Sequence, residues 1–251
     1  MLRHRILDFL PDRVGTRAID LYWRRLEPEI ASLPLVIQPG SVAIDVGAWR
    51  GPYTRAMARV AGHVHAFEPQ PRLARVLRVT SPPNVTVHAV ALSDGPPRRA
   101  CLWMPGGEAG LDALATLRDG RTSREVQREG RVEEIEVEAV PLDSVGIDRV
   151  GFIKIDVEGH ELAVLAGAEA TIAESRPRLL VEIEQRHLSC PVDEVFGWFD
   201  ERGYIAWFLR GPRWMPLQDF DLAQDQLALA ENPRAGGYVN NFLFTEPDFR
   251  W

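Results

Sequence analysis

The most informative stretch of the sequence is VAIDVGAWRG, residues 42–51. Its first five residues are apolar except for Asp45, a pattern typical of a buried strand that ends near a functional acid. Gly47 and Gly51 follow, and Pro52 can open a helix without the loss of a hydrogen bond. A glycine-containing turn between a strand and a helix lets a nucleotide-like ligand approach the backbone of a parallel sheet. We therefore expect a ligand site at this turn.

The same turn disfavours two common nucleotide-binding motifs. A dinucleotide fingerprint that starts at Gly47 needs glycines at the next two fixed positions, and these are Trp49 and Pro52. A Walker loop is excluded, because no lysine followed by serine or threonine closes the turn. An NAD-dependent oxidoreductase is therefore the less favoured enzymatic alternative.

Apolar runs alternate with helix-compatible segments around this turn. The helix-compatible segments are Tyr53–Val60 and Glu161–Glu174. The runs that predict strands are Val42–Val46, Val64–Phe67, Val85–Val90, Phe152–Ile155 and Leu179–Ile183. This alternation predicts an α/β fold with a mostly parallel sheet and helices on both faces.

Residues 101–140 interrupt the alternation after the third predicted strand. Within them, Ala100–Met104 and Val132–Val140 predict a hairpin carried by an insertion. We expect residues 40–251 to form one domain that includes this insertion, and residues 1–39 to form a helical extension packed on it. Farther along, the sequence predicts a helix at Val192–Arg202 and strands at Tyr204–Leu209 and Asn241–Thr245.

Acidic residues end the first two predicted strands. Asp45, before the glycines, suits a ligand that carries a cationic amino group and hydroxyls. Glu68 ends the second strand, where a carboxylate can accept both ribose hydroxyls of a nucleoside. S-adenosylmethionine has all of these groups, and residues 91–94 are placed to meet its adenine edge. A surface or helix-capping role for either acid is the alternative.

Several motifs together resemble one known family, the FkbM family of S-adenosylmethionine-dependent methyltransferases. They span roughly residues 40–185 and are Asp45–Thr54, Phe67–Pro69, Ala91–Asp94, Pro141–Asp143, Lys154–Glu161 and Arg176–Glu182. The resemblance implies a Rossmann-like class I methyltransferase sheet whose last strand, near residues 240–244, is antiparallel. It also implies methyl transfer to a hydroxyl of a sugar or natural-product acceptor.

The resemblance also implies which residues bind the cofactor. Where the family usually shows asparagine, this chain has Trp49. The cofactor-binding residues that it implies are Asp45, Gly47, Ala48, Gly51, Tyr53, Thr54, Glu68, Pro69, Ala91, Leu92, Ser93 and Asp156.

Further acids follow the fourth predicted strand, where a substrate would sit in this architecture. Methyl transfer to an alcohol requires the oxygen to be aligned with the methyl group and its proton to be removed. Asp156 is the first candidate base, His160 the second, and Glu182 is a candidate to orient the acceptor. Asp156 and Glu182 could also hold a divalent cation, but no tight ligand spacing favours a metal.

Composition narrows the class of partner. The 251 residues carry a formal net charge of -7, which disfavours nucleic acid and leaves a small molecule or glycan as the expected acceptor. Residues 30–44 lack charge but are broken by prolines and a glycine, so no transmembrane segment is expected. With two scattered cysteines and no secretory signal, we expect a cytoplasmic protein. A non-catalytic Rossmann-like binding module is the main alternative, and self-association stays open.

Overall fold

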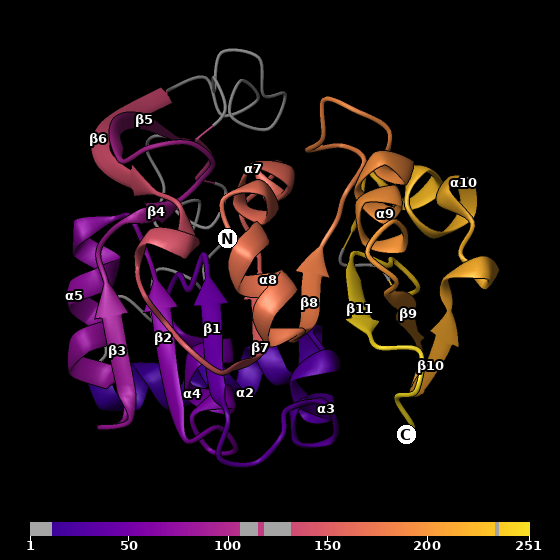
Figure 1. The fold of residues 1–251 in the computed structure, drawn as a ribbon, viewed down its shortest axis with the longest axis horizontal. Coiled ribbons are helices and arrows are strands. Elements are labelled where there is room, and N and C mark those ends of the chain that lie inside the picture. Colours follow the sequence, from indigo (N-terminus) through magenta and orange to yellow (C-terminus); the bar gives the residue numbers. More distant parts are fainter. Residues whose placement is uncertain (1–11, 106–114, 118–131, 234–235) are drawn as a thin grey trace.

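A computed structural model describes residues 12–105, 115–117, 132–233 and 236–251. Within these residues, eight strands form one sheet in the order β10-β9-β11-β8-β7-β1-β2-β3 (Figure 1). The strands are β1 (Val42–Val46), β2 (His63–Phe67), β3 (Val85–His88), β7 (Val150–Ile155), β8 (Arg178–Glu182), β9 (Ile205–Arg210), β10 (Arg213–Pro216) and β11 (Asn241–Thr245).

The pairing confirms a mostly parallel sheet with an antiparallel C-terminal strand. Strands β3, β2, β1, β7 and β8 are parallel to their neighbours. Strand β11 is antiparallel to both β8 and β9, between which it lies. Because parallel strands end on the same edge, the turns after β1, β2 and β7 meet there.

Helices cover both faces of the sheet. Alternate residues of β1 enter different cores, as the two-residue period of a strand requires. Ile44 packs in a core that includes Leu165 and Phe199, whereas Ala43 packs in one that includes Leu33 and Met57. The helices are α2 (Asp12–Leu26), α3 (Glu29–Val36), α4 (Pro52–Met57), α5 (Pro71–Thr80), α7 (Glu161–Ala166), α8 (Glu169–Ser175), α9 (Val192–Asp200) and α10 (Leu222–Asp225).

A second, three-stranded sheet follows β3, as the sequence predicts for the insertion. Strand β5 (Arg98–Pro105) pairs antiparallel with β6 (Val132–Val140), and β4 (Ala91–Leu92) runs parallel to β6. Figure 1 shows this sheet beyond the carboxyl ends of β1, β2 and β3. Most of the segment between β5 and β6 lies outside the described residues.

The segment predicted as one helix from Glu161 to Glu174 is two helices, so that prediction is wrong in detail. The break between α7 and α8 falls at Gly167, where a Cβ atom would lie 2.1 Å from the backbone oxygen of Ser93. The carboxylate of Asp143 then accepts the backbone N–H groups of Ala170 and Thr171, at 2.9 and 2.8 Å. A close backbone contact and a capping acid therefore divide the helix.

The two N-terminal helices pack beside the turn that follows β1. The guanidinium of Arg55 in α4 forms a buried ion pair with Asp20 in α2, with an Nη2 to Oδ1 distance of 2.6 Å. The same Arg55 donates to the backbone oxygen of Arg50 at 2.7 Å. No helix among the described residues is long and apolar enough to cross a membrane. The domain boundary at residues 39 and 40 stays a prediction.

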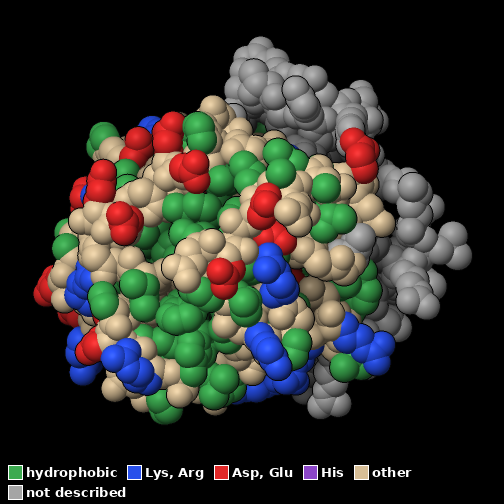
Figure 2. Space-filling model, turned by 90° about the vertical axis from the view of Figure 1, so that its right-hand side faces the viewer, with side chains coloured by type: hydrophobic (Ala, Val, Ile, Leu, Met, Phe, Trp, Pro, Cys, Tyr) green, Lys and Arg blue, Asp and Glu red, His purple; other side chains and the backbone are tan. Residues whose placement is uncertain are grey.

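The C-terminal side of the molecule exposes hydrophobic side chains among charged ones (Figure 2). Leu227 and Trp251 are among the exposed large side chains there. The ring of Trp251 stacks on that of Trp214, with 5.2 Å between the ring centroids. This aromatic contact fixes the end of the described chain to the strand β10.

Candidate active site

The turn after β1 is held by backbone contacts that only glycine permits. Gly47 has a φ angle of +79°, and a Cβ atom there would lie 1.8 Å from the backbone oxygen of Asp156. The N–H groups of Gly47 and Ala48 both donate to the carbonyl of Phe67 at 3.0 Å. Gly51, at φ +80°, ends the turn and leads into Pro52 at the start of α4. The turns after β1, β2 and β7 are thus locked together.

Asp45 lies beneath this turn. It is 2% exposed and accepts a hydrogen bond from the hydroxyl of Thr54 at 2.5 Å. Burial raises the pKa of Asp45 to about 6, against the opposing effect of the Thr54 hydrogen bond. Thr54 therefore orients a carboxylate that lies at the floor of the site.

Glu68, the residue after β2, holds the turn from the other side. It is 3% exposed, and its carboxylate accepts the backbone N–H groups of Trp49 at 2.8 Å and Gln70 at 2.9 Å. Trp49 has a φ angle of 45°, a strained conformation that this hydrogen bond helps to hold. The same carboxylate lines the neighbouring narrow pocket, where it presents hydrogen-bond acceptors.

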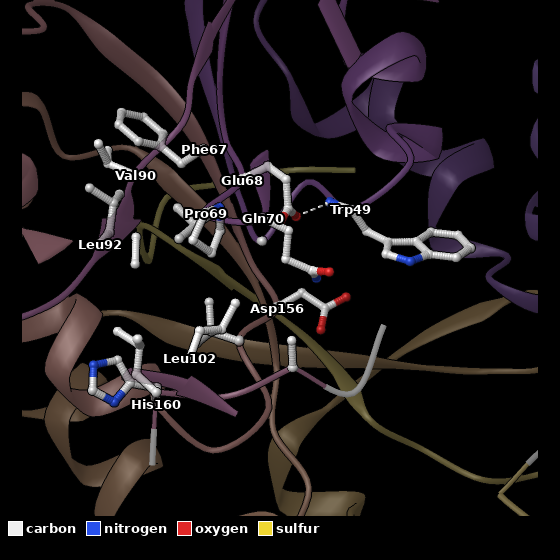
Figure 3. A pocket seen from close by; sticks show the side chains of 16 residues that line it. Trp49, Phe67, Glu68, Pro69, Gln70, Val90, Leu92, Leu102, Asp156 and His160 are labelled. Atoms are coloured by element: carbon white, nitrogen blue, oxygen red, sulfur yellow. Dashed lines mark hydrogen bonds between the residues drawn. The ribbon is translucent and has the colours of Figure 1, made fainter. Parts of the chain in front are cut away.

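A narrow pocket lies between the β1 turn and the small sheet. Figure 3 shows Phe67, Val90, Leu92 and Leu102 around its apolar part, with Glu68 and Asp156 at the polar side. The ring of His160 also lines this pocket, and its Nε2 atom lies 2.9 Å from the hydroxyl oxygen of Ser93. The apolar walls and the buried acid suit a flat heterocycle that carries a diol.

A second, larger cavity of about 470 Å³ opens on the other side of the β1 turn. It is lined by the end of α2, the link to α3, the ends of β7 and β8, and residues 236–240. Gly47, Trp49 and Asp156 line both spaces. The narrow pocket and the large cavity therefore meet at these three residues.

Lys154 is a buried cation at the base of the large cavity. Its side chain is 1% exposed, its Nζ atom lies 3.5 Å from Oδ2 of Asp156, and it lies 5.1 Å from the ring centre of Tyr53. Burial works to lower the pKa of Lys154, but surrounding carboxylates, led by Asp156 and Glu182, raise it above its usual value. The lysine thus stays charged and balances the acids around it.

Glu182, Glu184 and their partners form a polar wall of the same cavity. Asn240 donates to Oε1 of Glu182 at 2.8 Å. Burial, followed by the charge of Asp156, raises the pKa of Glu182 well above its usual value. Tyr238 donates to Oε2 of Glu184 at 2.5 Å, and Arg186 also pairs with that carboxylate. These contacts fix both carboxylates in place.

Glu158 forms an additional pair behind this wall. Its Oε2 atom lies 3.0 Å from Nε2 of His187, and its backbone has a φ angle of 52°. Burial raises the pKa of Glu158 to about 8, which His187 opposes. Among the described residues, no group of three or more histidine, cysteine or acidic side chains could hold a metal ion.

The structure brings most of the predicted site residues to these two spaces. The narrow pocket is lined by Gly47, Glu68, Pro69, Ala91, Leu92, Asp156 and His160. The large cavity is lined by Asp45, Gly47, Ala48, Tyr53, Asp156 and Glu182. Gly51, Thr54 and Ser93 line neither space, and their contacts act through Pro52, Asp45 and His160.

Sequence reasoning missed several residues of the cavity. Glu27, Tyr238 and Asn240 come from a helix link and a loop, and nothing in their local sequence marks them. Glu184 and Arg186 follow the end of β8, and charged residues directly after a buried strand are a signal that could have found them.

This fold and site define a class of protein. A twisted parallel sheet with a late antiparallel strand, a glycine turn after β1 and an acid after β2 is the arrangement of the Rossmann-like class I methyltransferases. A family model described as "Methyltransferase FkbM domain" matches residues 45–206. The chain belongs to this FkbM methyltransferase family, as the sequence motifs predict.

A solved structure of an FkbM methyltransferase has the same fold. Methyltransferase FkbM from Methylobacillus flagellatus is 17% identical with a TM-score of 0.50, and the match covers 96% of this chain but only 57% of that one. An rRNA methylase from Streptococcus thermophilus is 12% identical with a TM-score of 0.45, covering 87% and 93% of the two chains. A SAM-dependent O-methyltransferase from Thermotoga maritima is 14% identical with a TM-score of 0.43, covering 90% and 67%. A comparison with curated proteins finds no match.

Proposed function

We propose that this chain is an S-adenosylmethionine-dependent O-methyltransferase that acts on a hydroxyl of a sugar, glycan or natural product. The observation that carries the proposal is the connection between the two spaces. A narrow apolar pocket with Glu68 at its polar side adjoins, at Gly47 and Asp156, a polar cavity large enough for an acceptor. A ligand with a nucleoside at one end and a charged group at the other matches this shape.

The residues present fit this cofactor. The buried carboxylate of Glu68 lies at the polar side of the narrow pocket, where it suits the ribose hydroxyls, and Leu92 and Leu102 flank the place for the adenine. When bound, S-adenosylmethionine supplies an electrophilic methyl group on a sulfonium. The carboxylates of Asp45 and Asp156 lie on the side of the turn where positive charge is favoured.

Asp156 is the residue to which we assign the base. Its side chain is 29% exposed and lies where the two spaces meet, so it can reach both cofactor and acceptor. It takes the proton of the acceptor hydroxyl while Lys154, 3.5 Å away, holds its position. Glu182 lies in the same cavity and orients the acceptor. His160, which is hydrogen-bonded to Ser93, lines the narrow pocket that we assign to the nucleoside.

The lining of the large cavity supports a polyhydroxylated acceptor. Carboxylates of Glu182 and Glu184 offer hydrogen-bond acceptors, and Asn240 and Tyr238 surround them. Trp23 and Trp49 add aromatic surface, on which a sugar ring can pack. No divalent cation is required by this arrangement, because Asp156 itself accepts the proton.

The test is a transfer assay with S-adenosylmethionine labelled on its methyl group and a panel of monosaccharides, oligosaccharides and polyols. We expect label in an acid-stable ether of at least one acceptor. With that acceptor, Asp156→Asn should lower turnover at least about 100-fold while the affinity for S-adenosylhomocysteine changes little. Asp200→Asn, at an exposed position, is the matched control. Unchanged turnover in Asp156→Asn would remove this residue as the base.

A further inference from the structure

The link between α2 and α3 places an acid over the large cavity. Glu27 lies in this link, and its backbone N–H donates to the carbonyl of Trp23 at 2.7 Å. Its side chain lines the cavity, and its Oε2 atom is buried without a hydrogen-bond partner among the described residues. A buried carboxylate oxygen left in this way is rare in folded proteins, and it indicates a group that a ligand completes.

Tyr53 shares this condition. It is 5% exposed, it lies in the first turn of α4, and it lines the same cavity. Its hydroxyl oxygen is also buried without a hydrogen-bond partner within the described ranges. Burial, followed by the charge of Glu27, raises the pKa of the Tyr53 hydroxyl, and a side-chain interaction with Glu27 adds to the rise. The hydroxyl and the Glu27 carboxylate therefore lie within reach of each other, but they form no well-aligned hydrogen bond. Two neighbouring polar groups, one from the link and one from α4, therefore line the same part of the cavity.

The acidic side chains around Glu27 and Tyr53 favour a positively charged ligand group in this part of the cavity. The carboxylates of Asp156, Glu182, Glu27 and Asp45 all act on the buried cation Lys154. Of the arginines that line the cavity, Arg186 is paired with Glu184, Arg210 is paired with Asp225, and Arg25 is exposed. Burial raises the pKa of Glu27 to about 7, with Lys154 opposing that rise. A positively charged ligand group would favour the ionised form of Glu27.

The position of the link relative to the cofactor identifies this group. The ring of Trp23 contacts that of Trp49, with 5.3 Å between the ring centroids, so the end of α2 is fixed against the β1 turn. In the proposed function the ribose binds at Glu68, in the narrow pocket on one side of the turn. Glu27 and Tyr53 lie in the large cavity on the other side. The indole of Trp49 has only a donor, so it cannot accept a hydrogen bond from an ammonium group.

We propose that Glu27, together with the hydroxyl of Tyr53, binds the α-ammonium group of the cofactor's methionine portion. The inference rests on the proposed function, since it assumes the cofactor. The ammonium donates one hydrogen bond to Oε2 of Glu27 and another to the Tyr53 oxygen, and both atoms gain a well-aligned hydrogen bond. A segment that precedes the matched family domain thereby completes the cofactor site.

Calorimetric titration with two ligands tests this proposal. S-adenosylhomocysteine carries the ammonium group, whereas 5′-methylthioadenosine keeps the nucleoside and thioether but lacks the whole amino-acid end. In Glu27→Gln we expect the affinity for S-adenosylhomocysteine to fall at least about tenfold, and that for methylthioadenosine to stay within about twofold. Tyr53→Phe should show the same selectivity with a smaller loss. Asp200→Asn, at an exposed position outside the lining of the cavity, should leave the ratio of the two affinities unchanged.

Each outcome separates this inference from the proposed function. If the wild-type protein binds S-adenosylhomocysteine but Glu27→Gln binds it equally well, the ammonium site is wrong and the cofactor assignment stands. If Glu27→Gln weakens both ligands equally, Glu27 acts through the fold and the proposal is again overturned. If the wild-type protein binds neither ligand, the proposed function fails and takes this inference with it.

Discussion

Burial has a large effect on the pKa of one side chain near the site, that of Glu161. It is 3% exposed, and its carboxylate accepts the backbone N–H of Gly159 at 2.8 Å. Burial raises the pKa of Glu161 to about 7, although the backbone hydrogen bonds oppose the rise. The folded state therefore holds this proton more tightly than the unfolded state does.

Stability should consequently fall as the pH rises through the interval from the ordinary pKa of 4.5 to about 7. Glu161 contributes fully below this interval, and ionisation costs up to about 3 kcal/mol above it. In Glu161→Gln the pH dependence should be reduced by about that amount. Urea unfolding at pH 5 and pH 8 measures the difference, with exposed Glu174→Gln as the control. A gap between Glu161→Gln and wild type that is the same at both pH values would refute the assignment.

At this scale, the residues that could be predicted are those at strand ends. Asp45, Glu68 and Asp156 each end or follow a parallel strand, so their common location follows from topology. Glu27 and Asn240 could not be predicted, because loops bring them to the cavity from both ends of the chain. Their positions depend on tertiary packing, which no local pattern reports.

The element that carries most of the site is the turn between β1 and α4. Gly40 and Gly47 form a matched pair for testing it, because their φ angles are +80° and +79°. A Cβ atom at Gly40 meets nothing within 4 Å, whereas at Gly47 it would strike the backbone oxygen of Asp156. The two positions thus share backbone strain and differ in contact.

Gly40→Ala should cost only about 1 kcal/mol of stability and leave S-adenosylhomocysteine binding unchanged. Gly47→Ala should carry the same strain and also push the β1 and β7 turns apart, so binding should be lost. Thermal unfolding and calorimetry on both variants separate the two effects. Equal behaviour of the two variants would contradict the close packing of the turns.

A buried ion pair attaches α2 to α4. The ion pair of Arg55 and Asp20 has side chains that are 8% and 16% exposed, whereas that of Arg99 and Glu136 has 79% and 61%. Arg55→Ala should destabilise the protein by about 3 kcal/mol, because it leaves Asp20 and the Arg50 carbonyl without a partner. Arg99→Ala should cost less than about 1 kcal/mol. Denaturant unfolding that shows equal losses would mean that the buried pair does not hold the helix.

Helices and strands could be predicted where the hydrophobic periodicity of the sequence is strong. They could not be predicted where contacts between distant segments determine the local structure. The parallel strands and the hairpin stand out as apolar or alternating runs. The break at Gly167 depends on the approach of the Ser93 backbone, which is distant in sequence. The sequence also left α5 and β10 unassigned; β10 is a four-residue strand that forms against its neighbour β9.

For the whole molecule, the structure presents a narrow pocket and a larger cavity that share three lining residues, and the proposed function assigns the first to the nucleoside and the second to the acceptor. The family domain supplies the first, and the end of α2, the link to α3 and the loop before β11 close the second. Under the proposed function, we expect these segments outside the strand and helix repeat to determine which acceptor is bound. The net charge of -7 favours an acceptor that is not a polyanion.

The central claim is that the site binds S-adenosylmethionine, and a calorimetric titration of the purified chain tests it most directly. S-adenosylmethionine and S-adenosylhomocysteine should each bind saturably at one site per chain, and NADH, as the control nucleotide, should not. Binding of NADH in place of the other two, or of none of the three, would contradict the account.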